Sequence, residues 1–131
     1  MKDKSLQVST KMAVIMGIFL PLAETVRRSN QLLDISEFFS WFDDYILGGV
    51  LLAAAYMVYK NRNNAVAYLI AAWGIASGAL LLSFLSQFSY YKTPSGDPGI
   101  FSTTFVLAAK SIIFIYILIG LKKAIDANLA R

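Results

Sequence analysis

The sequence contains no cysteine and no histidine. Without cysteine, the chain can form no disulfide, no thiolate-ligated zinc site or iron–sulfur cluster, and no thiol nucleophile. Without histidine, it lacks imidazole ligands for metals or haem and the side chain that most often acts as a base near neutral pH. The common hydrolase, metalloprotease and phosphate-loop motifs are missing too. We therefore expect no catalytic residue, no cofactor and no metal site.

Charged residues are scarce, at 15% of the 131 residues, against about 25% in soluble domains. Hydrophobic residues make up 57%, and the mean hydropathy is +0.59. A disordered chain would need low hydrophobicity and high net charge. The composition therefore indicates one integral membrane domain over residues 1–131. The net charge is +4, and the basic residues lie beside apolar runs. We therefore attribute the positive charge to membrane topology rather than to binding of nucleic acid.

Four apolar segments are long enough, or nearly so, to cross a bilayer. A hydrocarbon core about 30 Å thick needs roughly 20 helical residues, and helices satisfy the backbone internally in lipid. The predicted spans cover about residues 10–28, 41–60, 65–86 and 102–121. The expected fold is thus all-α, with four transmembrane helices in an antiparallel bundle joined by short loops.

The first apolar segment follows three lysines and has the pattern of a secretory signal peptide. Cleavage after Ala23 would place Pro21 where a small residue is required. We therefore expect this segment to be retained as the first span rather than removed.

The connection between the first two spans carries apolar residues at helical spacing, with acidic residues on the opposite face. This pattern predicts an amphipathic helix over about 32–44, and its aromatic residues favour the membrane interface. Asp34, Glu37 and Asp44 are on that opposite face, and Asp43 is the fourth acidic residue of the segment. Carboxylates are ligands for hard divalent cations, but this spacing matches no known metal loop.

The distribution of basic residues predicts the orientation. With four spans, both termini lie on one side of the membrane. That side carries eight of the twelve basic residues: Lys2, Lys4, Lys11, Lys60, Arg62, Lys122, Lys123 and Arg131. The positive-inside rule then places both termini in the cytoplasm, and the helical spans suit a bacterial inner membrane.

Several charges lie at membrane depth. Counting helical rise from the flanking lysines puts Glu24 about 20 Å and Lys110 about 18 Å from the inner side, which suggests an ion pair that offsets the cost of burying each charge. By the same count, two arginines and two aspartates share a level about 24 Å deep. The candidate intramembrane polar network is Glu24, Arg27, Arg28, Asp43, Asp44 and Lys110. It could line a binding cavity or ion path, or it could be a salt-bridge cluster that fixes packing.

Small residues recur at four-residue spacing, which lets helix backbones approach closely in lipid. The candidate helix-packing residues are Gly49, Ala53, Ala67, Ala71, Gly74 and Gly78. They could form an interface with another copy or a membrane partner, or they could pack inside one bundle.

Three functions are compatible with these features. The first is a non-enzymatic subunit that acts through self-assembly or a membrane protein partner, surrounded by the lipid bilayer. The second is a minimal ion- or proton-coupled transporter or channel that uses the charged residues at membrane depth. The third, a lipid-modifying enzyme, has no specific motif in its favour.

Overall fold

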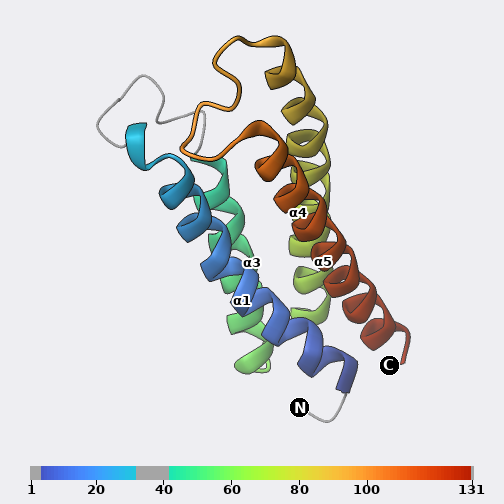
Figure 1. The fold of residues 1–131 in the computed structure, drawn as a ribbon. Coiled ribbons are helices and arrows are strands. Elements are labelled where there is room, and N and C mark those ends of the chain that lie inside the picture. Colours follow the sequence, from blue (N-terminus) through green and yellow to red (C-terminus); the bar gives the residue numbers. More distant parts are fainter. Residues whose placement is uncertain (1–3, 32–41, 131) are drawn as a thin grey trace.

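The computed structural model describes residues 4–31 and 42–130, and its regular elements in these ranges are all helical (Figure 1). They are α1 (Lys4–Arg27), η1 (Ser29–Gln31), α3 (Asp43–Tyr59), α4 (Ala65–Gln87), η2 (Phe88–Lys92) and α5 (Thr103–Leu129). The predicted amphipathic helix over about 32–44 lies almost entirely outside the described residues. Its last two positions, Asp43 and Asp44, open α3.

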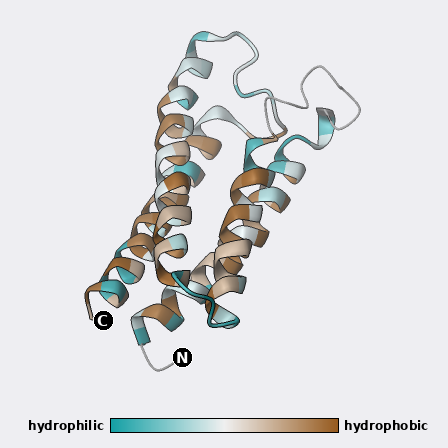
Figure 2. Cartoon of the chain, turned by 180° about the vertical axis from the view of Figure 1, so that it is seen from behind, coloured by the Kyte–Doolittle hydropathy of each residue, from teal (hydrophilic) through white to brown (hydrophobic). Residues whose placement is uncertain are grey.

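Three helices are long and apolar enough to cross a membrane: α1, α4 with its continuation through η2, and α5. The 17 residues of α3 extend about 26 Å at 1.5 Å per residue, slightly less than a hydrocarbon core of about 30 Å. Figure 2 shows hydrophobic residues along the helices and hydrophilic ones toward their ends and in the turn between α3 and α4.

The four long helices run alternately up and down (Figure 1). Helix α1 packs beside α3 and α5, and α4 packs beside the same two helices, so α1 and α4 lie diagonally opposite. Both ends of the chain and the α3–α4 turn lie at one end of the bundle, which we call the terminal end. The short helices η1 and η2 and residues 93–102 lie at the other, the loop end.

The connections follow local sequence chemistry. In the α3–α4 turn, Asn61 and Asn64 have φ values of 53° and 62°, and asparagine adopts this left-handed conformation more readily than most residues. Helix α5 begins after Ser102, whose Oγ accepts a hydrogen bond from the Phe105 amide at 3.1 Å. A serine cap of this kind satisfies one of the free N–H groups at a helix start.

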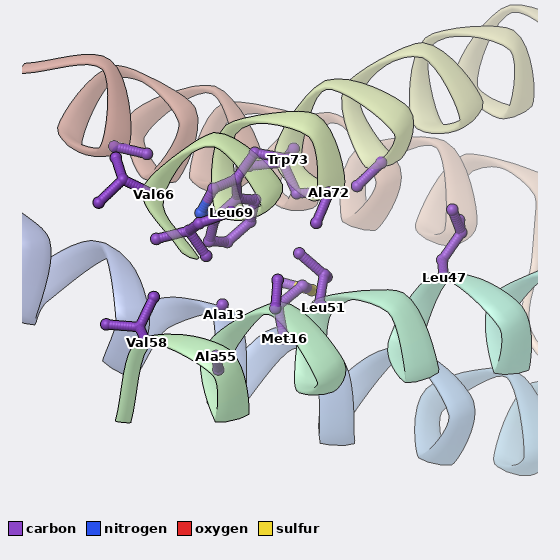
Figure 3. Packing of buried hydrophobic residues seen from close by; sticks show 14 of the residues in the cluster. Ala13, Met16, Leu47, Leu51, Ala55, Val58, Val66, Leu69, Ala72 and Trp73 are labelled. Atoms are coloured by element: carbon purple, nitrogen blue, oxygen red, sulfur yellow. The ribbon is translucent and has the colours of Figure 1, made fainter. Parts of the chain in front are cut away.

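Toward the terminal end, a buried indole joins three helices. Trp73 of α4 is fully buried, and its Nε1 donates to Ser9 Oγ of α1 at 2.9 Å. Ser9 Oγ in turn donates to the carbonyl oxygen of Gly120 on α5 at 2.9 Å. A side chain at Gly120 would collide with the Trp73 ring. Figure 3 shows Trp73 and Leu69 facing the apolar side chains of α1 and α3.

Helices α1 and α3 meet through a pair of glycines. A Cβ atom at Gly48 would lie 2.5 Å from the Gly17 carbonyl oxygen, and one at Gly17 would lie 3.0 Å from the Gly48 carbonyl oxygen. Both positions are buried. The two backbones therefore touch directly, as small residues permit in membrane helices.

Candidate functional site

A cavity of about 780 Å³ lies toward the loop end of the bundle, between α1, α3, α4 and α5. All six residues of the candidate polar network line it: Glu24, Arg27, Arg28, Asp43, Asp44 and Lys110. They come from α1 and the residue that follows it, from α3 and from α5. Most of the remaining wall is apolar, and the volume lies in the range of sites that hold small molecules.

Glu24 holds the α1 part of the network together. Its two carboxylate oxygens each accept a hydrogen bond from Arg27 Nη1 at 3.1 Å. One of them also accepts from Arg28 Nε at 3.0 Å. All three side chains are buried. The ion pairs follow from the helix itself, because residues three and four positions apart share a face.

Arg27 has a second carboxylate partner that the sequence did not suggest. Its Nη2 lies 2.5 Å from Asp97 Oδ1, and its Nε donates to Oδ2 at 3.3 Å. The Arg27 carbonyl oxygen also accepts from the Ile100 amide at 2.9 Å. A Cβ at Gly99 would collide with the Arg27 backbone, so this glycine permits the close approach. Residues 97–100 are thereby fastened onto the end of α1.

The Asp97 carboxyl lies between the bundle helices and its own loop. Burial raises the pKa of Asp97, but hydrogen bonds from Arg27, from Gln87 and from the Gly99 amide, together with the Arg27 charge, outweigh this effect. The net result is a pKa below the ordinary value for aspartate. Asp97 is therefore a carboxylate at neutral pH, and the loop is held by charge-assisted hydrogen bonds.

Lys110 on α5 binds α4 rather than Glu24. Its Nζ donates to Gln87 Oε1 at 2.8 Å and to the Ser83 carbonyl oxygen at 3.2 Å. The Gln87 amide nitrogen donates to Asp97 Oδ1 at 3.0 Å. Glu24 and Lys110 are thus connected through Arg27, Asp97 and Gln87 and not by a direct ion pair.

The two aspartates of α3 differ in their surroundings. Asp43 is exposed, and its carboxylate accepts a hydrogen bond from the Asp44 amide at 3.0 Å. Asp44 is half-buried, with its carboxyl beside that of Glu24 and within electrostatic range of Lys110. It forms no ion pair with any residue of ranges 4–31 and 42–130. Asp34 and Glu37 lie outside these ranges.

Two residues that complete the network, Gln87 and Asp97, were missed from the sequence. Gln87 is the one amide side chain in α4, a helix without charged residues, and it is fully buried, so its polarity was a usable signal. Asp97 stands between Gly96 and Pro98, where aspartate commonly forms turns. An aspartate at such a position gives no indication that it forms a buried ion pair with Arg27.

The candidate helix-packing residues face away from the bundle. An added Cβ atom at Gly49, Gly74 or Gly78 would meet no atom within 4 Å. The three alanines of the set are exposed: Ala53, Ala67 and Ala71. Helices inside the bundle approach each other closely at different glycines, among them Gly17, Gly48 and Gly120.

Within the part of the chain that the structure describes, no group of three or more Asp and Glu side chains could hold a metal ion. The chain matches no protein-family model, no curated protein and no solved structure. Arguments about its function therefore rest on the geometry of the bundle.

Proposed function

We propose that this chain is an integral membrane protein with four helical spans. Three helices, α1, α4 with η2, and α5, are by themselves long and apolar enough to cross a membrane. The shorter α3 packs between α1 and α4 and contributes Leu51 and Ala55 to the same buried core. It therefore lies at the depth of its neighbours, and a bilayer accommodates a span that is a few ångströms short at modest cost.

The terminal end of the bundle is proposed to face the cytoplasm of a bacterial inner membrane. Eight of the twelve basic residues belong to this end when four spans are assumed. Cytoplasmic loops carry an excess of lysine and arginine. The exposed Lys60, Arg62 and Lys122 lie at this end and support the orientation.

For the activity itself, we propose a non-enzymatic subunit that assembles with a second copy of the chain through α4. The observation that supports this most directly is the outward position of Gly74 and Gly78. Together with Ala67 and Ala71 they follow helical spacing of four, three and four residues, so they form one exposed stripe. Glycine lowers helix propensity and offers no side chain to lipid, whereas it lets a second helix approach closely.

The test measures the oligomeric state of the purified full chain in mild detergent by native mass spectrometry. We expect a dimer for the wild type and a monomer for Gly74→Ile and Gly78→Ile, because the larger side chains hold two α4 helices apart. Ala108→Ile, at an exposed small residue of α5, is the matched control and should remain dimeric. A monomeric wild type, or isoleucine variants that remain dimeric, would rule out this interface.

The second candidate is a small ion- or proton-coupled transporter or channel, favoured by the cavity that six ionisable side chains line. Its test is flux into proteoliposomes. Flux that disappears in Lys110→Met and in Glu24→Gln but persists in Lys122→Met, an exposed lysine of α5, would support it. Absence of any wild-type flux for protons and for Na⁺, K⁺ and Cl⁻ would dismiss it.

A further inference from the structure

Two carboxyl groups from different helices meet in the cavity. Glu24 of α1 and Asp44 of α3 both line it, and their side chains are hydrogen-bonded to each other. The next residues along the two helices, Thr25 and Tyr45, are joined by a hydrogen bond between their hydroxyl groups. Helices α1 and α3 are therefore held side by side at the level of the two carboxyl groups.

The hydrogen bond between these carboxyl groups requires a proton. An ionised carboxylate has only acceptor atoms, whereas a protonated carboxyl group has one O–H donor. Two carboxyl groups that share a site also resist ionising together, because their like charges repel each other. A hydrogen-bonded pair of this kind holds one proton between its oxygen atoms.

The arginines next to Glu24 indicate which carboxyl group carries the proton. The Glu24 carboxylate accepts hydrogen bonds from Arg27 Nη1 at 3.1 Å and from Arg28 Nε at 3.0 Å, and such contacts favour the ionised form. Within ranges 4–31 and 42–130, no lysine or arginine forms a salt bridge with Asp44. These surroundings favour the proton on Asp44, whose hydroxyl group then donates to the Glu24 carboxylate.

Other charged groups act on the pair from a greater distance. Lys110 of α5 and Asp43 of α3 lie within electrostatic range of Asp44 and have opposite effects on its ionised form. Asp97 of the loop before α5 is paired with Arg27. Uncharged polar side chains of α4 and η2 also line the cavity: Ser83, Ser86 and Tyr90. The Glu24–Asp44 contact is therefore the place where two acidic groups touch directly.

The pair lies close to water at the loop end. Asp43, at the start of α3, is exposed, and its carboxylate accepts a hydrogen bond from the Asp44 amide at 3.0 Å. About one turn further toward the terminal end, Leu20 of α1 and Leu47 of α3 are buried in the apolar core. A proton on Asp44 can therefore exchange with water at the loop end, whereas the core separates it from the terminal end.

We propose that Glu24 and Asp44 form a proton-binding site that holds one exchangeable proton at neutral pH and links the start of α3 to α1. When the proton leaves, the O–H bond of Asp44 breaks, the proton passes to water at the loop end, and two carboxylates remain side by side. Their repulsion moves the start of α3 away from α1. The site rests neither on the proposed dimer nor on transport, because it binds a proton without moving one across the membrane.

Infrared spectroscopy of the purified full chain in mild detergent tests the shared proton. Aspartate and glutamate side chains are ordinarily ionised at neutral pH, since their pKa values are about 4. We expect the wild type to show the C=O stretching band of one protonated carboxylic acid per chain at neutral pH, and we expect this band to shift in D2O. Absence of the band, or a band that does not respond to D2O, would overturn the proposal.

Variants test whether the proton belongs to the pair. Asp44→Asn should remove the band, and the new amide can donate to Glu24 in place of the hydroxyl group, so the contact between α1 and α3 is retained. Glu24→Gln should also remove the band, because the two arginines lose their carboxylate and Asp44 ionises to replace it. Asp43→Asn, one residue away and exposed, is the matched control and should keep the band. A band that persists in either variant of the pair would overturn the assignment.

A distance measurement tests the movement of α3. The sequence has no native cysteine, so spin labels can be attached at Val26→Cys on α1 and Ile46→Cys on α3, two exposed positions. Pulsed electron paramagnetic resonance should show a longer distance between the labels at alkaline than at neutral pH. With Asp44→Asn added, the distance should not change, because no proton remains to be lost. A constant distance in the labelled chain without Asp44→Asn would overturn the movement, and an equal change in both would overturn the assignment to this pair.

Discussion

Asp97 connects three parts of the loop end. Its carboxylate accepts hydrogen bonds from Arg27 of α1, from Gln87 of α4 and from the Gly99 amide of its own loop. Its amide donates to Thr103 Oγ1 at the start of α5. Removing this one charge would leave Arg27 only Glu24 as a carboxylate partner, although Glu24 also binds Arg28.

The first prediction concerns this ion pair. Asp97→Asn should lower the free energy of unfolding by about 3 kcal/mol, the scale for breaking one side of a buried pair. Chemical unfolding of the full chain in detergent, followed by far-UV circular dichroism, measures the change. Asp126→Asn removes an exposed pair with Lys122 and should cost less than about 1 kcal/mol. Equal losses in the two variants would contradict the central position of Asp97.

The second prediction concerns pH. The pKa of Asp97 is lower in the folded chain than the ordinary value, which is about 3.9 in an unfolded chain. The stability that this carboxylate contributes is therefore fully present above about pH 4 and is lost as the pH falls through the folded pKa. Thermal unfolding of the wild type should show a decline below pH 4 that is weaker in Asp97→Asn. Identical acid profiles would exclude Asp97 as the source.

Counting helical rise along the sequence was sufficient to predict that six charged residues lie at similar depths, and all six line one cavity. The count could not predict which of them form ion pairs with each other. Counting residues along a helix gives depth, whereas an ion pair also depends on the direction in which each side chain points. Glu24 and Lys110 were expected to pair on depth alone. Gln87 and Asp97 fill the space between them, and Asp97 comes from a loop whose path no periodicity describes.

Among the helices, the packing of α5 against α4 and α1 depends on Gly120. Its missing side chain leaves room for the Trp73 ring, and its carbonyl oxygen accepts the bond from Ser9. The third prediction is that Gly120→Ala lowers the free energy of unfolding by roughly 1–3 kcal/mol, the usual cost of overpacking. Gly49→Ala, in open space on α3, should leave it within about 0.5 kcal/mol of the wild type. A tolerated alanine at position 120 would show that Trp73 can move freely.

Three of the four predicted spans lie on helices that are long and apolar enough to cross a membrane, whereas the apolar runs predicted the helix ends less closely. Helix α5 continues to Leu129, eight residues past the predicted end of the span at 121. Hydropathy marks only the part of a helix that suits lipid, whereas Lys122 and Asp126 extend α5 as an exposed pair four residues apart. The sequence also could not show which face of each helix is turned toward the bundle. The spacing of Gly74 and Gly78 indicated a helix contact, but it did not show that these two glycines point away from the other helices.

For the molecule as a whole, the proposed arrangement of four spans predicts which loops share a side of the membrane. The sequence has no native cysteine, so single cysteines introduced at exposed sites can be labelled without background. The fourth prediction is that Asn63→Cys reacts with a membrane-impermeant maleimide only after the cells are opened. Ser95→Cys, at the loop end, should react in cells permeabilised only at the outer membrane. Labelling of both from the same side would contradict a crossing by α4.

The pairing of Arg27 with Asp97 also affects the order of events during synthesis. Seventy residues separate the two, which at 5–20 residues per second takes roughly 4–14 s to translate. Throughout that interval Arg27 of the nascent α1 has Glu24 beside it but lacks its loop partner. The nascent first helix therefore presents this arginine to the insertion machinery or to the membrane surface until the loop that carries Asp97 has been made. Slowing translation between codons 28 and 97 should lengthen that exposure and increase the share of chains that are degraded.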